Sequence, residues 1–134
     1  MNTSESALKL MLDALVDAGF SRARIVRGSR TVIAKQFNGY IVSVDLMVDP
    51  ERVAKICLFG RSNVRTHFET FLSIGRAIGD VDLGQLYVVG TRRTGVIFKI
   101  NTHVNWENAT KDNFVEIAKK VKEFAKKVQG IVGT

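Results

Sequence analysis

The chain has 134 residues, 46% hydrophobic and 25% charged, which are the proportions of one ordinary globular domain and not of a disordered chain. Its formal net charge of +7 is compatible with an acidic partner without requiring one. No apolar run reaches the roughly 18–20 residues of a membrane-spanning helix, and Glu5, Lys9 and Asp13 interrupt the first apolar pattern, unlike in a signal peptide. We therefore expect a single domain over residues 1–134 that is cytoplasmic and has no membrane contact.

The first predicted element is an amphipathic helix over about residues 4–18. Thr3 or Ser4 is placed to cap its first turn, Gly19 suits the left-handed position after its last turn, and Phe20 suits a hydrophobic contact beyond it. Its apolar residues recur at helical spacing and are Leu8, Met11, Leu12, Leu15 and Val16.

The next forty residues carry the patterns of three or four strands. Gly28-Ser29 predicts a turn, and Asn38-Gly39 is a strong hairpin signal because both residues tolerate a positive φ. Asp49–Arg52 has the composition of a type I turn. The expected strands are Arg24–Val26, Thr31–Phe37, Tyr40–Val48 and Val53–Phe59. In the third of these, alternation places Tyr40, Val42, Val44, Leu46 and Val48 on one face.

A second helix is predicted from a cap at Ser62 or Asn63 to about Ile78, with Gly79 closing it. Its expected buried stripe is Val64, Phe68, Phe71, Leu72, Gly75 and Ile78. Gly75 within that stripe predicts a close approach to a neighbouring element. A last hairpin is expected to consist of Leu83–Val89, a tip over Gly90–Gly95, and Val96–Asn101.

The final helix is predicted to start at Thr110 or Asn108 and to stop at Gly130. Its apolar residues are spaced 3, 4, 3, 4 and are Phe114, Ile117, Val121, Phe124 and Val128. Two interpretations of this stripe stay open. It covers the sheet, which predicts that its residues are buried, or it pairs with a second copy of the chain.

The lysines of this helix are spaced for ion pairing along one exposed face. Glu116 precedes Lys120 and Glu123 precedes Lys127 by four residues each, which is the stabilising orientation. This pattern favours a solvated helix face over a nucleic-acid-binding patch.

The order of elements is helix, three or four strands, helix, two strands, helix. Consecutive strands without a helix between them indicate an antiparallel sheet. We therefore predict an α+β domain of α-β-β-β-α-β-β-α order, in which helices pack on an antiparallel sheet as a two-layer sandwich.

The sequence contains no recognisable catalytic constellation. His67 and His103 are the only histidines, Cys57 is the only thiol, and no His, Cys, Asp or Glu residues have zinc-ligand spacing. Cys57 lies in an apolar run, where a cysteine behaves as a small hydrophobe. Gly90–Gly95 has the glycine spacing of a phosphate loop but lacks the Lys-Ser/Thr that follows. We expect no enzymatic activity, no cofactor and no bound metal.

Positive charge is concentrated around the first predicted hairpin. Residues 21–36 carry five basic and no acidic side chains, whereas residues 37–109 carry eight basic against seven acidic ones. Arginine guanidinium groups suit phosphates and carboxylates alike. The candidate contacts to an anionic partner are Arg22, Arg24, Arg27, Arg30, Arg92 and Arg93.

The succession of elements resembles the type III secretion chaperone-like fold, including YbjN-like domains. The resemblance extends from Ser4 to Gly130 and is carried by the Leu8–Gly19 helix, the Asn38-Gly39 hairpin, the Ser62–Gly79 helix and the Phe114–Val128 helix. Proteins of that kind bind other polypeptides without catalysis and often dimerise through the sheet or the middle helix. The resemblance therefore implies a chaperone-like or adaptor module that forms a homodimer.

Two functions follow from these observations. The leading hypothesis is a small non-catalytic protein-interaction module, whose partner is itself or another chain. The alternative is a basic nucleic-acid-binding protein that contacts phosphates through the six candidate arginines. The two arginine-bearing hairpins distinguish them, because convergence on one surface favours nucleic acid, and divergence with an apolar patch elsewhere favours protein.

Overall fold

The computed structural model describes residues 1–35, 41–60, 68–92 and 95–132, with side chains at 1–35, 41–59, 72–85 and 97–131. The described residues form three helices and six strands. The helices are α1 (Ser4–Asp17), α2 (Phe68–Val81) and α3 (Lys111–Val132). The strands are β1 (Ser21–Ile25), β2 (Thr31–Lys35), β3 (Ile41–Leu46), β4 (Val53–Gly60), β5 (Gln85–Arg92) and β6 (Gly95–Asn105).

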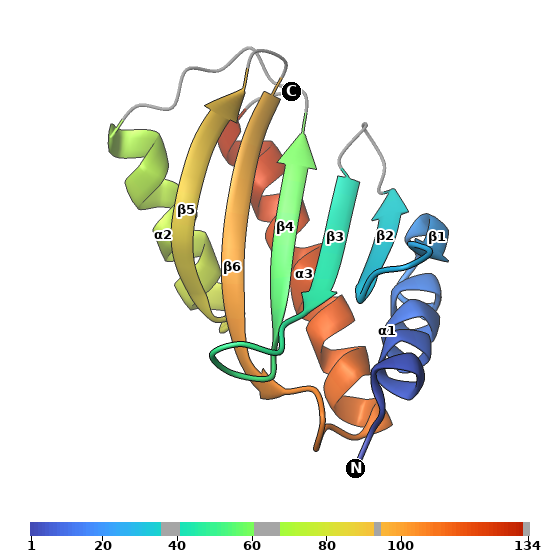
Figure 1. Ribbon diagram of the computed structural model, residues 1–134. Helices are drawn as coiled ribbons and strands as arrows, with labels where there is room; N and C mark the ends of the chain where they lie inside the picture. Colours follow the sequence, from blue (N-terminus) through green and yellow to red (C-terminus); the bar gives the residue numbers. More distant parts are fainter. Residues whose placement is uncertain (36–40, 61–67, 93–94, 133–134) are drawn as a thin grey trace.

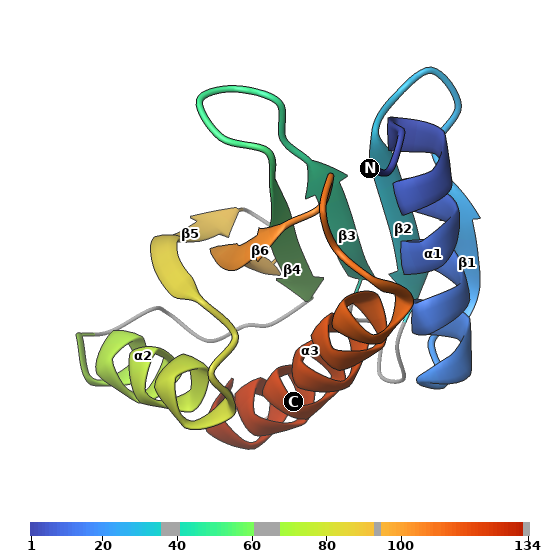
Figure 2. The ribbon, with the colours of Figure 1, turned by 90° about the horizontal axis from the view of Figure 1, so that it is seen from below.

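The strands form one antiparallel sheet in the order β1-β2-β3-β4-β6-β5. The three helices lie together on one face of this sheet, with α3 between α1 and α2 (Figures 1 and 2). This arrangement confirms the predicted α+β sandwich and element order. The segment around Arg24 is a strand, so four strands precede α2.

The core fills the space between the sheet and α3. All five residues of the predicted α3 stripe are buried, at 0–3% exposure, and Ala118 and Ala125 widen it. Phe124 meets Phe98 of β6 edge to face, with ring centroids 6.4 Å apart. The apolar stripe of α3 therefore covers the chain's own sheet, which was the first of the two interpretations.

The ends of α1 are as the sequence predicts. The Thr3 side chain accepts a hydrogen bond from the Ser6 N–H, Gly19 has φ +98°, and the Phe20 N–H donates to the Leu15 carbonyl at 3.0 Å. The predicted stripe is wrong at Val16, which is 52% exposed. Ala7 and Ala14 are buried in the stripe.

The buried face of α2 differs from the stripe that the sequence predicts. Leu72 is 42% exposed, and a Cβ built on Gly75 would meet nothing within 4 Å, so neither residue packs closely against a neighbour. The buried residues of its described side chains are Ile74, Ala77, Ile78 and Val81. The expected cap at Ser62 or Asn63, and the side chains of Val64, Phe68 and Phe71, lie outside the described residues.

Several predicted boundaries are wrong, among them the end of the last strand, because β6 runs to Asn105 and not to Asn101. Helix α2 runs past Gly79, and Asp82, with φ +50°, takes the left-handed position after it. Helix α3 continues through Gly130 to Val132, because Ile131 still packs on the core. Strand pairing extends to Arg92 and Gly95, so the tip of the last hairpin is shorter than predicted.

The connection between β3 and β4 is a loop in place of the predicted type I turn. Its ends are joined by a hydrogen bond of 2.9 Å from the Met47 N–H to the Val53 carbonyl, and the Asp49–Pro50 peptide is cis. Residues 47–52 therefore form a six-residue loop at one end of the sheet.

Candidate interaction surface

The second face of the sheet, which we call the open face, has no helix over it in the described part of the chain (Figure 1). Alternation along the strands sends one set of side chains toward the helices and the other set to this face. The inward set includes Val32, Val44, Ile56 and Phe98, all 0% exposed. The described side chains of the open face include Arg24, Thr31, Ile33, Lys35, Ile41, Ser43, Asp45, Val53, Lys55, Cys57, Phe59, Ile97, Lys99 and Asn101.

Strand register arranges the open face into rows that run across the strands. The first row is Lys35, Ile41, Phe59 and Ile97 on β2, β3, β4 and β6. The second row is Arg24, Ile33, Ser43, Cys57 and Lys99. The third row is Thr31, Asp45, Lys55 and Asn101. The face therefore grades from an apolar row to a polar one.

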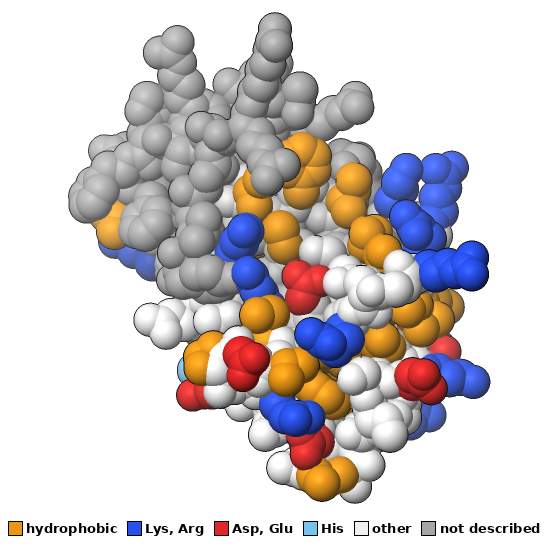
Figure 3. All heavy atoms as spheres, viewed as in Figure 1, with side chains coloured by type: hydrophobic (Ala, Val, Ile, Leu, Met, Phe, Trp, Pro, Cys, Tyr) orange, Lys and Arg blue, Asp and Glu red, His pale blue; other side chains and the backbone are white. Residues whose placement is uncertain are grey.

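The apolar part of the open face is continuous across the central strands. Phe59 stands between Ile41 and Ile97 as the direct cross-strand partner of both. Ile41 and Phe59 are half-buried, and Ile97 is 9% exposed but lies outside the core cluster. Figure 3 shows hydrophobic side chains across this face and a gathering of Lys and Arg toward β1 and β2.

Basic residues surround this apolar part. Arg24 and Lys35 lie at the β1–β2 side and are exposed, while Lys55 and Lys99 lie on β4 and β6. Asp45 is the acidic residue of the face among those described, and it accepts a hydrogen bond from the Thr31 hydroxyl. Among its described side chains, the open face therefore carries four cations against one anion.

Cys57 lies at the centre of the open face and is half-buried. Burial raises the pKa of its thiol, although the nearby Lys99 ammonium and the hydrogen bond with Ser43 act in the opposite direction. A raised thiol pKa keeps the residue protonated and weakly nucleophilic at neutral pH. The cysteine is thus apolar in character, as predicted, but it faces away from the helices.

Four of the six candidate arginines lie in or next to the β1–β2 hairpin, and all four are exposed. Arg24 points to the open face through its register with Ile33. The Arg30 Nε donates to the Leu46 carbonyl at 3.3 Å, so this arginine also fastens the hairpin to β3. Arg22 has φ +53° at an irregularity in the β1–β2 pairing.

The two arginine-bearing hairpins do not converge. Because successive neighbours in the sheet are antiparallel, β5 points the same way as β2. Arg92 at the end of β5 therefore lies at the opposite end of the sheet from the Gly28-Ser29 turn that precedes β2, and β1 and β5 are opposite edges. The side chain of Arg92 and all of Arg93 lie outside the described residues.

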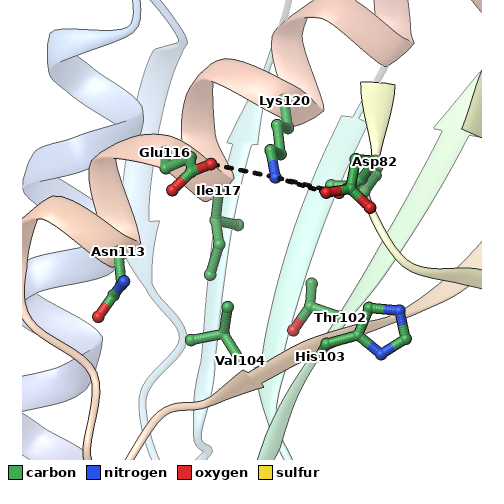
Figure 4. A pocket seen from close by; sticks show the side chains of 9 residues that line it. Asp82, Thr102, His103, Val104, Asn113, Glu116, Ile117 and Lys120 are labelled. Carbon is green, nitrogen blue, oxygen red and sulfur yellow. Dashed lines mark hydrogen bonds and ion pairs between the residues drawn. The ribbon is translucent and has the colours of Figure 1, made fainter. Parts of the chain in front are cut away.

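A cavity of about 110 Å³ lies between α3, β6 and the turn that follows α2 (Figure 4). Lys120 reaches across its mouth, with Nζ 3.1 Å from Glu116 Oε1 and 3.7 Å from Asp82 Oδ2, and it donates to the Asp82 carbonyl at 3.1 Å. The buried Thr102 hydroxyl donates to the Ala54 carbonyl. The Lys120 contacts with Asp82 fasten α3 to the turn after α2, and the Thr102 hydrogen bond joins β6 to β4.

The lysines of α3 follow the predicted pairing in part. The Glu116–Lys120 pair is formed, as the spacing predicts. For Lys127 the structure gives a different partner, because its Nζ lies 3.9 Å from Asp80 Oδ2 on α2. The Lys127–Asp80 contact joins α3 to α2, whereas the Glu116–Lys120 pair lies within α3.

Sequence reasoning missed a cluster around Trp106, which is 2% exposed. Its indole Nε1 donates to the Met47 carbonyl at 2.7 Å, and its backbone N–H donates to the Arg52 carbonyl at 3.0 Å. The Arg52 guanidinium lies 5.8 Å from the Trp106 ring centroid and 2.8 Å from Glu107. The Asn2 amide donates to the Trp106 carbonyl, so the cluster also holds the N-terminus.

Comparisons of the chain with models of protein families, with curated proteins and with solved structures return no match. Within the described residues, no group of three His, Cys, Asp or Glu side chains is placed to hold a metal ion. No helix in that part of the chain is long and apolar enough to cross a membrane.

Proposed function

We propose that this protein is a non-catalytic interaction module that binds an acidic partner protein on the open face of its sheet. One observation carries the proposal. The open face has no covering layer in the described chain and presents the apolar residues Ile41, Phe59 and Ile97. The basic residues Lys35, Arg24 and Lys99 lie beside them.

The apolar row supplies the energy of association. Burying apolar surface contributes about 25 cal/mol per Å², and domains gain stability when each sheet face is packed against another element. A partner that covers Ile41 and Phe59 completes a third layer.

The charges select the partner. Four cations against Asp45 favour an acidic surface, because complementary charge speeds association and disfavours basic partners. Two copies meeting by this same face would place these cations opposite each other. Homodimerisation therefore stays a separate prediction: light scattering at high micromolar concentration should give twice the 14.9 kDa mass of the chain, and the monomer mass would contradict it.

Nucleic acid is the alternative occupant. The exposed arginines of the β1–β2 hairpin favour it, but the other arginine-bearing hairpin lies at the far end of the sheet, so the two do not build one phosphate-binding surface. If nucleic acid is the partner, affinity should fall with salt by a log–log slope of about −0.9 per phosphate contact.

The test is a titration of the chain, by fluorescence anisotropy, with acidic leucine-containing peptides, a basic peptide, duplex DNA and single-stranded RNA at about 50 and 200 mM salt. We expect an acidic peptide to bind, and Lys99→Glu to weaken it about tenfold or more, since close interfacial charge pairs couple by about 1.5 kcal/mol or more. The control is Lys126→Glu, which makes the same charge change on the exposed face of α3. Binding of DNA or RNA in preference to every acidic peptide would replace this proposal with the alternative.

A further inference from the structure

We infer that the segment bound on the open face is an amphipathic α-helix with acidic residues near both ends and an apolar stripe between them. This inference rests on the proposed function and specifies the partner that the face accepts.

Backbone hydrogen bonding favours a helix over an extended segment. The open face lies over β2, β3, β4 and β6, and each of these strands is already paired on both sides. An extended peptide lying on the face would therefore find no main-chain partners in the sheet, and leaving buried N–H and C=O groups unpaired costs about 1–3 kcal/mol each. A helix pairs its own backbone groups and brings only side chains to the face.

A second sheet would also pair its own backbone groups, and a second copy of this chain would supply one. Face-to-face packing of two copies would oppose Lys35, Lys55, Lys99 and Arg24 of one chain to the same residues of the other. Like charges facing each other across an interface cost several kcal/mol. The charge of the face thus argues for a helix from a different, acidic chain.

The placement of the cations sets where the acidic residues of the helix lie. Lys35 is on β2 and Lys99 is on β6, three strand spacings or about 14 Å away, and the two lysines lie in adjacent rows, about 7 Å apart along the strands. At a rise of 1.5 Å per residue, the resulting separation of about 16 Å spans about ten to eleven helical residues. Acidic residues at both ends of a three-turn helix therefore reach Lys35 and Lys99 together.

The apolar row determines what lies between those acids. Ile41 and Phe59 separate Lys35 from Ile97 in the first row, and Ile33 and Cys57 occupy the second row beside them. Leucines at helical spacing cover both rows, whereas the polar third row bounds the contact on its other side. The same helix therefore gains apolar burial at its centre and charge pairing at its ends.

The experiment uses three soluble 18-residue peptides of identical composition. The first has leucines at helical spacing with glutamates near both ends, the second alternates the same leucines as in a strand, and the third keeps the helical leucines but moves the glutamates to the middle. Anisotropy gives the affinity, and circular dichroism of the mixture gives the helix gained on binding. We expect the first peptide to bind at least about tenfold more tightly than the other two and to become helical.

A charge exchange tests the placement of the acids. The double variant Lys35→Glu/Lys99→Glu should no longer bind the first peptide. It should instead bind a peptide of the same pattern with lysines in place of the glutamates near both ends. The control Lys119→Glu/Lys126→Glu should keep the original preference. Thermal melts establish that each variant is folded. Tighter binding of the strand-patterned peptide, binding without a gain of helix, or no exchange of preference would overturn the helix while leaving an acidic partner in place. If no acidic peptide binds, the proposed function fails as well.

Discussion

The two faces of the sheet are built by the same strands and differ in what they bury. On the covered face, Val32, Val44, Ile56 and Phe98 are 0% exposed and meet α1, α2 and α3. On the open face, isoleucines and a phenylalanine alternate with lysines and an aspartate. Each strand therefore carries a set of side chains that is buried under the helices and a set that faces the open side, separated by one residue of register.

This difference separates the residues that hold the fold from those available for binding. Substitutions on the covered face should act through stability, and substitutions on the open face should act through affinity with smaller effects on folding. The predictions below test that division, beginning with the largest expected effect.

Phe124→Ala should destabilise the protein by about 3–5 kcal/mol, because it removes a buried ring that packs edge to face on Phe98. Phe59→Ala removes the same side chain from the open face and should cost about 1 kcal/mol. Urea unfolding and thermal melts of both variants measure the comparison. Equal losses for the two would mean that the open face is as much a part of the core as the covered one.

Trp106→Phe should cost about 1–3 kcal/mol, since it keeps an aromatic ring but leaves the Met47 carbonyl without the indole donor. Arg52→Ala serves as the control, because it removes the exposed half of the same cluster and should cost less than about 1 kcal/mol. The measurement is the free energy of unfolding in urea. A smaller loss for Trp106→Phe than for Arg52→Ala would contradict the role of the indole hydrogen bond.

Local patterns predicted the elements well where the signal was periodic. The α3 stripe, the Thr3 cap and the Gly19 end of α1 needed only residues within one element, and each is as expected. Boundaries failed where tertiary packing overrode a local signal. Gly79 and Gly130 stay helical because residues beyond them, Val81 and Ile131, pack on the core.

The candidate site was not visible in the sequence. Alternation in β3 identified two faces, but which face stays open depends on β6 pairing with β4 and on all the helices lying on one side. Both are long-range choices that no local pattern encodes. The arginines were visible as charge, but the placement of the two hairpin turns at opposite ends of the sheet also required the topology. Trp106 gave no signal because its hydrogen-bond partners Arg52, Met47 and Asn2 lie 54 to 104 residues earlier in the chain.

Arg22→Gly should be neutral or stabilise the protein by up to about 1.5 kcal/mol. Arg22 has φ +53°, which costs a non-glycine residue roughly 1–2 kcal/mol, and glycine removes that cost while losing about 0.5–1 kcal/mol of chain entropy. Arg24→Gly, two residues along the same strand, has no positive φ to relieve and should destabilise. Urea midpoints of the two variants compare them. A loss at Arg22 equal to that at Arg24 would show that the Arg22 side chain stabilises the edge strand.

The smallest effect is expected at Cys57, which tests how solvated the open face is. Its pKa is raised in the folded chain, chiefly by burial, so the folded state holds the thiol proton more tightly than the unfolded state does. The stabilisation is therefore complete below the unfolded thiol pKa and is lost as pH rises through the folded one. As pH rises past the usual thiol pKa of about 8.5, the native chain should lose slightly more stability than Cys57→Ser, which does not titrate there.

Alkylation measures the same property directly. The pH dependence of iodoacetamide labelling should give a higher thiol pKa in the native protein than in urea, because the thiolate is the reacting form. Burial is the largest cause of the raised pKa and the Asp45 carboxylate adds to it, whereas the Lys99 ammonium beside the thiol acts to lower the pKa. Lys99→Gln should therefore raise the native pKa further, while Lys126→Gln, on the exposed face of α3, leaves it unchanged. A native pKa at or below the value in urea would mean that the centre of the open face is fully solvated. The difference in solvent exposure between the two faces would then be larger than the burial of Cys57 indicates.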